Sequence, residues 1–288
     1  MPIMLKKRPA VSVFIGIILL CSFSFGVEIR LRLASGLLRQ NPEDLNLALA
    51  GWQRQLETRA EVDPNVDYIS GTAAALRWGV LFEAELLFCF SSRLAVGLSG
   101  GYAYAEAAEE DTLLAIVWDG VIYNHARPTK ISAYPFALSA YYFVPLGSKL
   151  SAYLRAGAGY IQAKYTAREG VKKDYETPYS YFSVETAQAG RPVFLGGLGL
   201  GYQFDPSFGL FIEATAHSAK VRGFKGVNTL QQDGTLFAFE EYIPDSDFWQ
   251  AKLGVWPEAP AGSGFRSVRE AVIDLSGFSV KMGIVLKF

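Results

Sequence analysis

Charge, cysteine and histidine are scarce in this chain. Charged residues make up 19% of its 288 residues, where soluble domains have roughly 25%, and the formal net charge is −1. Two cysteines are too few for a disulfide framework. The chain has two histidines, and no cluster of potential ligands has the spacing of a metal site. The chain also lacks the cationic excess that binding to a nucleic-acid backbone requires. We therefore expect no metal, no cofactor and no nucleic-acid partner.

Long apolar runs are also missing, except at the N-terminus. A membrane helix needs about 20 consecutive apolar residues, and nothing past residue 27 has that character. Yet 50% of the residues are hydrophobic, 14% are aromatic, and the mean hydropathy is +0.17. So many aromatic residues argue against a disordered chain. The mature protein is therefore apolar without helical spans.

The first 26 residues have the features of a secretory signal peptide. Three basic residues at 6–8 precede a short apolar stretch, and Gly26 supplies a small residue for cleavage. The alternatives are an uncleaved anchor over residues 9–27 and, less favoured, a lipoprotein signal at Cys21. Cleavage after Gly26 leaves 262 residues, a net charge of −4 and Cys89 as the one remaining cysteine.

Past residue 26, hydrophobicity alternates with a period of two, which is typical of strands whose successive side chains point to opposite faces. The clearest case is the C-terminal strand, in which small or charged residues mostly separate Phe278, Val280, Met282, Ile284, Leu286 and Phe288. Seven other segments alternate in the same way. The eight predicted strands are about 27–38, 76–90, 94–106, 131–145, 150–165, 191–205, 208–220 and 278–288.

Short and long connections alternate between these strands. The short turns are 91–93, 146–149 and 206–207, and the long loops are 39–75, 107–130, 166–190 and 221–270. This places all short turns at one end, as in membrane barrels. The four loops carry 21 acidic and 13 basic residues, as solvated surface would. We predict an all-β fold over residues 27–288: an eight-stranded antiparallel up-and-down transmembrane β-barrel with long external loops.

The two faces of the strands differ in character. The large apolar residues suit lipid on the outside, where tyrosines form interfacial girdles, while small and charged residues suit a narrow interior that side chains fill. The inward charged residues fall at similar depths from the short-turn end: Arg30, Arg32, Glu83, Glu85, Arg155, Glu213 and Lys281. Since a buried charge must be paired or hydrated, we predict an interior ionic layer, with Arg30 and Arg32 opposite Glu83 and Glu85. The alternative is separate pairs with trapped water.

The C-terminal strand resembles the terminal signature of bacterial outer-membrane barrels. Its alternating apolar positions are occupied by Val280, Met282, Ile284, Leu286 and Phe288. With its signal peptide and eight strands, the chain resembles the small barrels of the OmpA-transmembrane, OmpX and OmpW type. That resemblance implies a place in the outer membrane among its lipids. It also implies periplasmic chaperones and the barrel assembly machinery as partners, the machinery reading those five residues as its signal.

The loops contain recognisable local signals. In loop 39–75, Asn41 is a candidate cap, Pro42 a first helical residue, and a helical apolar stripe follows, made of Leu45, Leu49, Trp52 and Leu56. Hairpin turns are expected at 118–121 and 233–234, which contain Asp-Gly. Apolar loop residues that could contact a ligand at the barrel mouth are Leu47, Trp52, Trp249 and Trp256.

The predicted function is a structural, adhesive or ligand-binding role exercised through the external loops. The alternative is OmpW-like transport of small hydrophobic molecules through a pocket at the mouth, and a third reading is a secreted soluble barrel. A lipid A-modifying enzyme is disfavoured, because His217 and Ser218 are adjacent on a strand and point to opposite faces. We expect no catalytic residues.

Overall fold

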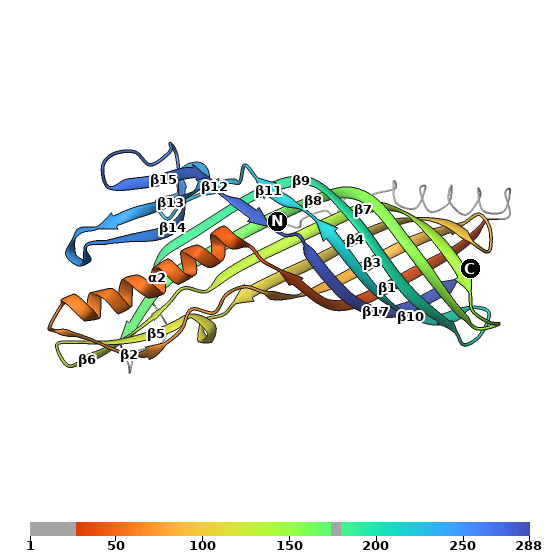
Figure 1. Ribbon diagram of the computed structural model, residues 1–288, viewed down its shortest axis with the longest axis horizontal. Helices are drawn as coiled ribbons and strands as arrows, with labels where there is room; N and C mark the ends of the chain where they lie inside the picture. The colour runs from red at the N-terminus through yellow and green to blue at the C-terminus, as the bar shows by residue number, and fades with distance from the viewer. Residues whose placement is uncertain (1–26, 174–179) are drawn as a thin grey trace, which may run out of the picture.

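Figure 1 shows the computed structural model, an elongated and mostly β molecule described over residues 27–173 and 180–288. The predicted signal peptide, residues 1–26, lies outside these described residues. Among the described residues, no helix is long and apolar enough to cross a bilayer, a finding that does not concern strands.

Eight antiparallel strands form a closed ring. In spatial order they are β1 (Glu28–Gln40), β3 (Trp78–Cys89), β4 (Leu94–Ala107), β7 (Thr129–Pro145), β8 (Leu150–Lys173), β9 (Ser180–Gln203), β10 (Phe208–Ser218) and β17 (Gly277–Lys287). The ring closes where β1 pairs with β17, with Leu33 opposite Ile284. Each strand pairs with its neighbour along the chain except across this closure, so the predicted up-and-down barrel is confirmed.

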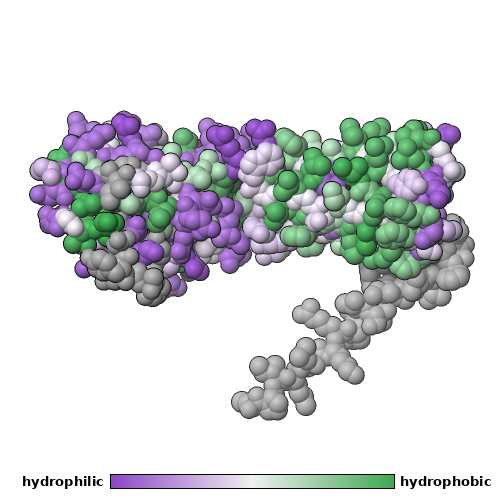
Figure 2. Space-filling model, turned by 90° about the horizontal axis from the view of Figure 1, so that it is seen from below, coloured by the Kyte–Doolittle hydropathy of each residue, from purple (hydrophilic) through white to green (hydrophobic). Residues whose placement is uncertain are grey.

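One end of the barrel carries an apolar outer belt. Many of the large side chains that point outward are 40% exposed or more, including Phe136, Leu154, Phe194, Leu198 and Met282. The tyrosines predicted to face outward do so, and Tyr134, Tyr142, Tyr160 and Tyr202 are each more than 40% exposed. Figure 2 shows this belt as a zone of hydrophobic colour at one end of the molecule, with hydrophilic colour prevailing toward the other.

Beyond the belt, the sheet opens and extends into a structure that we call the crown. From the edge of β8 it continues through β6 (Val121–Ala126), β5 (Leu113–Trp118) and β2 (Val66–Gly71). From the edge of β9 it continues through β12 (Lys225–Val227), β13 (Asp233–Ile243) and β14 (Phe248–Trp256). Smaller pieces complete it: η1 (Glu110–Thr112), β11 (Lys220–Arg222), η2 (Pro244–Ser246), β15 (Phe265–Glu270) and β16 (Val272–Asp274).

The helix α2 (Glu43–Val62) lies against β14 and also contacts β2, and thereby bridges the two free edges of the crown sheet. Gly51 sits so close to the backbone of Ala251 that a Cβ would have no room. The predicted stripe is confirmed, because Leu45, Leu49, Trp52 and Leu56 are all buried. The predicted cap is wrong by one position: Pro42 occupies the N-cap and no side chain caps the helix. Asn41 instead accepts a hydrogen bond from Asn46, 3.3 Å away.

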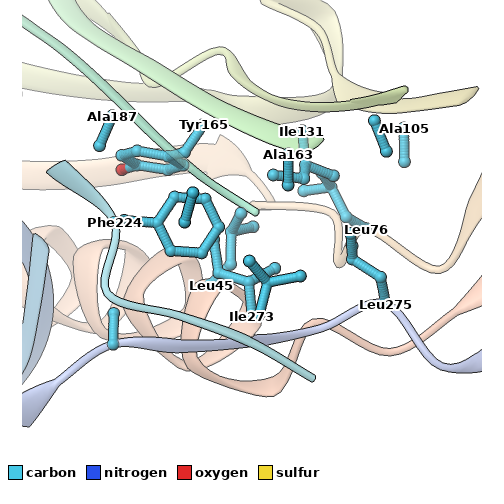
Figure 3. Close-up of a cluster of buried hydrophobic side chains, with 14 of the residues drawn as sticks. Leu45, Leu76, Ala105, Ile131, Ala163, Tyr165, Ala187, Phe224, Ile273 and Leu275 are labelled. Atoms are coloured by element: carbon cyan, nitrogen blue, oxygen red, sulfur yellow. The ribbon is translucent and has the colours of Figure 1, made fainter. Parts of the chain in front are cut away.

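The largest apolar cluster among the described residues runs from the top of the barrel into the crown. Figure 3 shows Leu45 of α2 and Ile273 of β16 beside Phe224, with Tyr165 of β8 and Ala187 of β9 on the opposite side. The core therefore joins residues from two of the long connections to the two longest barrel strands. It covers the mouth of the barrel at the end of the long loops.

One of the two expected hairpin turns forms. Asp119 and Gly120 have φ of 48° and 75° and join β5 to β6, as a type I′ turn requires. The prediction at 233–234 is wrong, because both residues lie in β13 and pair with Gly226 and Val227. That hairpin turns at 228–232 instead, where Asn228 Oδ1 accepts the backbone N–H groups of Leu230 and Gln232.

Candidate functional site

The structure gathers six of the seven predicted inward charges into one ionic layer inside the barrel. Its members are Arg32 (β1), Glu83 and Glu85 (β3), Arg155 (β8), Glu213 (β10) and Lys281 (β17). The side chains of Arg155 and Glu213 are completely buried, and none of the six is more than 13% exposed. Three cations face three carboxylates, so the layer is neutral as a whole.

Glu213 lies at the centre of the layer. Its Oε1 is 2.9 Å from Arg155 Nη1 and 2.9 Å from Lys281 Nζ, and its Oε2 is 2.9 Å from Arg32 Nη2. Around it, Arg32 Nη1 reaches Glu85 Oε2 at 3.0 Å. Because every charge has an opposite partner within contact distance, the layer meets the condition for burying ions.

Glu83 joins two of the cations on the other side of the layer. Its Oε1 is 2.9 Å from Arg155 Nη1 and 2.7 Å from Lys281 Nζ. Lys281 is opposite Gly36 of β1 and Glu213 of β10, so closure of the barrel brings it into the layer.

Tyrosine and serine hydroxyls that the sequence analysis missed complete this network. Tyr141 OH donates to Glu85 at 2.7 Å, and Tyr153 OH donates to Glu213 at 2.9 Å. Ser139 Oγ and Ser99 Oγ accept from Arg155 at 3.1 and 3.2 Å. The alternation of side chains along each strand could have identified both tyrosines, since they stand at odd-numbered positions, which point inward in β7 and β8.

Arg30 does not join the layer, which corrects the prediction for this residue. It sits two positions nearer the short-turn end than Arg32. Its Nε pairs with Glu28 at 2.6 Å, and its guanidinium lies 5.4 Å from the ring centre of Phe143. Arg30 therefore belongs to the barrel opening, where Glu28 is within reach and the carboxylates of β3 are not.

The ionic layer separates two cavities inside the barrel. The lower cavity, about 200 Å³, opens at the short-turn end and is bordered by Arg30, Arg32 and Lys287. The upper cavity, about 80 Å³, has Arg155 and Lys281 in its floor. We call it the chamber; its walls are mainly small or apolar: Leu38, Leu81, Ala103, Ile161, Val193, Leu195 and Leu275. The apolar core of the crown lies above it.

The proposed mouth contacts are not brought together. Trp52 is 1% exposed, and its Nε1 donates to Glu169 at 3.0 Å within the crown. Leu47 is 50% exposed and borders a different cavity, of about 90 Å³, between α2 and β13. Trp249 packs with Tyr242, and Trp256 packs with Phe239 and Phe265. The loops fold into a crown with its own core, and this core distributes the four residues over separate surfaces.

The crown holds a second buried polar group. Arg127 lies 3.5 Å from Glu169, which is also the acceptor of Trp52. Burial would lower the pKa of Arg127, but Glu169 and its other neighbours raise it above the usual value. Burial raises the pKa of Glu185, whose Oε2 has no hydrogen-bond partner. The sequence carried no signal for this group, because its members come from three distant segments.

The terminal residues proposed as an assembly signal line the outer face of β17. Met282 is 66% exposed, Phe288 is 74% exposed and Val280 is 46% exposed, while Ile284 and Leu286 are half-buried. The backbone N–H of Phe288 donates to Ile29 at 3.0 Å, so the last residue remains part of the closing ladder.

Groups with reactive side chains are dispersed. His217 borders the chamber, Ser218 is exposed on the other face of β10, and Cys89 is a free buried thiol. Within residues 27–173 and 180–288, no three His, Cys, Asp or Glu residues are placed to hold a metal ion.

No protein-family model matches the chain, and no curated protein matches it. Solved structures with a similar fold include the outer membrane protein OprG from Pseudomonas aeruginosa. It is 9% identical, with a TM-score of 0.42 over 91% of this chain and 96% of that chain. The attachment invasion locus protein Ail of Yersinia pestis, solved with the heparin analogue sucrose octasulfate, is 10% identical. Its TM-score is 0.36 over 91% and 99% of the two chains.

The outer membrane protein AlkL, solved in DMPC lipid bilayers, is 12% identical, with a TM-score of 0.34 over 91% of this chain and 90% of that chain. All three are eight-stranded outer-membrane β-barrels, the type that the sequence resembles. Because these scores are low, the fold assignment rests on the strand pairing of the chain itself, which is that of an eight-stranded up-and-down barrel.

Proposed function

We propose that the protein is a bacterial outer-membrane barrel that holds a rigid, folded crown outside the cell for adhesion or ligand binding. The observation that carries this proposal is the continuity of crown and barrel. β8 and β9 pair from Leu150 opposite Tyr202, in the belt, to Val171 opposite Ser180, in the crown, with one shift of register between Glu169 and Gly170. A crown built on the barrel's own strands presents a fixed surface.

The belt supports residence in a membrane. Three large apolar side chains of the belt are each more than 60% exposed: Phe194, Leu198 and Met282. Few large apolar side chains of a protein in water are so exposed. Monomeric soluble proteins seldom expose contiguous apolar patches beyond a few hundred Å². A closed barrel pairs the backbone groups of its strands, so the belt can enter lipid without unsatisfied polar groups.

The filled interior supports a role at the surface in preference to a wide pore. The ionic layer occupies the cross-section of the barrel, and the core of the crown covers its mouth. The crown loops carry eight more acidic than basic residues. We infer that the partner of the crown presents a cationic or neutral surface, since like charges repel.

Epitope tags at the two ends of the barrel test the location and the orientation. A tag inserted at Gly120, in the turn between β5 and β6, should be detected by antibody on intact cells. The matched tag at Gly147, in a short turn with no neighbouring side chain, should be detected only after the outer membrane is opened. Detection of Gly147 on intact cells, or of neither tag in the outer-membrane fraction, would contradict the proposal.

The charge of the crown can be tested separately. The protein, held in phosphatidylcholine nanodiscs, should be retained on a polylysine surface and released as salt rises, because screening weakens exposed charge pairs. It should not be retained on heparin. Retention on heparin alone would contradict an acidic binding surface while leaving the location of the protein untouched.

The chamber favours transport of small hydrophobic molecules as a second candidate function. The β4–β7 ladder runs as far as Gly100 opposite Phe136 and resumes at Ala103 opposite Ala133. The interruption contains Pro135, which has no N–H to donate, and Pro135 also borders the chamber. Since the ionic layer and the core close both ends, a substrate would have to cross sideways at this interruption.

Filling the chamber tests this second function. Ile161→Trp should abolish uptake of a small hydrophobic probe into cells if the chamber is the route. Leu47→Trp, on an exposed crown position, is the matched control. Equal uptake in the two variants would eliminate the chamber as a route.

We propose no enzymatic activity for the chain, and we propose that the outer face of β17 is its assembly signal. His217→Ala should leave the acyl chains of lipid A unchanged. Phe288→Ala should lower the amount of heat-modifiable barrel in the membrane more than Phe278→Ala does, at the other end of the same strand. Equal losses would point to stability of the strand in place of a terminal signal.

A further inference from the structure

The lower cavity, which opens at the short-turn end of the barrel, is bordered by cations without matching acids. Arg30, Arg32, Lys149 and Lys287 all line it. Arg32 belongs to the neutral ionic layer, so its charge is already balanced by Glu85 and Glu213. Among the residues that the structure describes, no aspartate or glutamate lines this cavity. Its walls therefore carry an excess of positive charge.

Two of these cations, Arg30 and Lys287, stand directly opposite each other where β1 and β17 close the barrel. Residues at opposite positions of antiparallel strands have their Cβ atoms about 5 Å apart, and like charges there are destabilising. Glu28 relieves part of this repulsion, since its Oε1 lies 2.6 Å from Arg30 Nε, but the side chain of Glu28 is 43% exposed. An anion between Arg30 and Lys287 would remove the remaining repulsion.

Hydrogen-bond donors at the opening of the lower cavity outnumber the acceptors. Lys287 Nζ donates to Gln203 Oε1, and the amide nitrogen of Gln203 donates to a backbone carbonyl of the neighbouring turn at 2.9 Å. An ammonium has three donors, so Lys287 retains two. Among the described residues, no acceptor bonds to the two terminal nitrogens of Arg30 or to Lys149 Nζ. The opening therefore offers several charged donors to a ligand.

The inner end of the lower cavity is aromatic. Tyr153 and Phe211 adjoin the ionic layer there, with their ring centres 4.9 and 3.7 Å from the guanidinium of Arg32. Phe143 lies between this end and the opening, with its ring centre 5.5 Å from that of Tyr153 and 5.4 Å from the guanidinium of Arg30. The cavity measures about 200 Å³. Sites for drug-sized ligands have roughly 300–1,000 Å³, so a fitting ligand is small.

We propose that the lower cavity binds a small organic anion, with its anionic group between Arg30 and Lys287 and its apolar body against Phe143 and Phe211. A carboxylate accepts charge-assisted hydrogen bonds from guanidinium and ammonium groups, and an apolar body removes the phenylalanine rings from water. The inference rests on the proposed function only for the source of the ligand. With the crown outside the cell, the short-turn end faces the periplasm.

Fluorine NMR of 4-fluorobenzoate tests the proposal. The mature protein is held in phosphatidylcholine nanodiscs, where both ends of the barrel meet the solution, and empty nanodiscs give the background from lipid. 4-Fluorobenzamide is the matched control ligand, because it has nearly the same shape without the charge. Arg30→Gln/Lys287→Gln removes the two cations of the site. Arg93→Gln/Lys164→Gln removes the same two residue types at exposed positions that do not line the cavity.

We expect the wild-type protein to bind 4-fluorobenzoate in a saturable manner and to leave 4-fluorobenzamide free. The apparent affinity should fall about tenfold or more in Arg30→Gln/Lys287→Gln, because hydrogen bonds to charged groups are strong, and should be unchanged in the control variant. No saturable binding, equal binding of the amide, or equal losses in the two variants would overturn the proposal. Displacement by an equal concentration of inorganic phosphate would overturn the role of the apolar body.

Two further variants distinguish the site from the stability of the strands. Arg30→Lys/Lys287→Arg keeps both positive charges and should retain most of the binding. Ser151→Phe fills the wall of the cavity and should abolish binding with every cation still in place. Heat-modifiable gel mobility shows whether each variant is folded. Binding that survives in folded Ser151→Phe would place the ligand outside the cavity and contradict the proposal.

The location of the protein is judged separately by the tags at Gly120 and Gly147. A chain that binds 4-fluorobenzoate but exposes the Gly147 tag on intact cells would contradict the proposed orientation and keep the cavity as a site. A chain with the expected tags that does not bind 4-fluorobenzoate would contradict the cavity site alone.

Discussion

Arg155 contacts all three carboxylates of the ionic layer. Its guanidinium lies 2.9 Å from Glu83, 3.3 Å from Glu85 and 2.9 Å from Glu213. Arg155→Met would leave these carboxylates with one cation fewer in a buried site. Breaking a buried ion pair from one side costs about 3–5 kcal/mol, so we expect a loss of that size in the free energy of unfolding, measured by urea titration in lipid vesicles.

Arg93→Met is the control, because Arg93 is exposed in a short turn and its loss should cost less than about 0.5 kcal/mol. Arg155→Lys keeps the charge but loses the planar fork, and should fall between the two. If Arg155→Met were as stable as the wild type, the layer would not be a strongly coupled unit.

The ionic layer shows what single residues reveal in a sequence. Inward parity and depth from the short turns were enough to group Arg32 with Glu85. They could not separate Arg30, because a shift of two positions along β1 keeps the same parity and changes only which carboxylate is in reach. Tyr141 and Tyr153 were missed because tyrosine was assigned to the outer girdle as a residue type.

His125 makes the stability of the crown depend on pH. Burial lowers its pKa below the usual 6.5, against a smaller opposing effect of Glu169, while Arg59 lowers it further. The folded state therefore binds fewer protons than the unfolded state. Stability from this group is complete above the unfolded pKa and is lost as pH falls through the folded pKa.

We therefore expect the crown of the wild-type protein to unfold at lower urea at about pH 5.5 than at about pH 7.5. In His125→Gln this difference should shrink, as followed by tryptophan fluorescence. An unchanged pH dependence in the variant would assign the effect to other groups.

At the scale of elements, α2 offers a matched pair of leucines. Leu49 is 2% exposed against the crown core, and Leu47, two residues earlier, is 50% exposed. Leu49→Ala should destabilise the crown by about 2–5 kcal/mol through lost burial and a cavity, and Leu47→Ala should have little effect. Limited proteolysis, with cuts mapped by mass spectrometry, would show cleavage at lower protease in Leu49→Ala.

Heat-modifiable mobility of the barrel should be the same in both leucine variants, since α2 packs on crown strands. If both variants were cut alike, α2 would not be held by the face that its stripe predicts.

The sequence predicted the existence of the strands far better than the positions at which they end. Alternation identified all eight barrel strands, and a helical stripe identified α2. However, β8 and β9 each run for 24 residues, well past the predicted ends near 165 and 191. Beyond the belt the apolar face of the strand is reversed: Ala163, Tyr165 and Ala167 face the crown core, and polar residues between them face water. The outward apolar pattern that marks a membrane strand therefore ends while the pairing continues.

Asp-Gly shows the same limit at a turn. At 119–120 both neighbouring strands are long enough to pair, and the preference of Asp-Gly for a two-residue turn determines where the hairpin turns. At 233–234 the asparagine-centred turn at 228–232 starts the pairing earlier, and Gly234 is used within a strand because the backbone of Trp256 lies against it. Local signals cannot rank two competing turns.

At the scale of the whole molecule, two barriers block the interior of the barrel along its axis. The ionic layer lies between the two cavities, and the crown core lies above the chamber. We expect no stable single-channel conductance from the purified protein in planar bilayers. Steady openings in the wild type, abolished by a bulky residue at Ile161, would show that water passes the layer.

Closure of the barrel followed from the number of strands and the alternation of turns, but the crown core did not follow from the sequence. Leu45, Phe224 and Ile273 lie in two different loops and meet only in three dimensions. The four loops together were predicted to be solvated surface, because their charged residues outnumber those of the strands. This total charge concealed the apolar residues of different loops that pack against one another.

The long pairing of β8 and β9 also determines how the molecule bears load. The pairing runs from Leu150 to Val171, and these 22 residues correspond to about 70 Å, from the short turns to the crown. If a bound surface pulls the crown along the barrel axis, the ladder hydrogen bonds lie across the pull and share the force in shear. A hairpin peeled from its tip would lose them one at a time. In the membrane location that we propose, this geometry would make the protein a stiff tether.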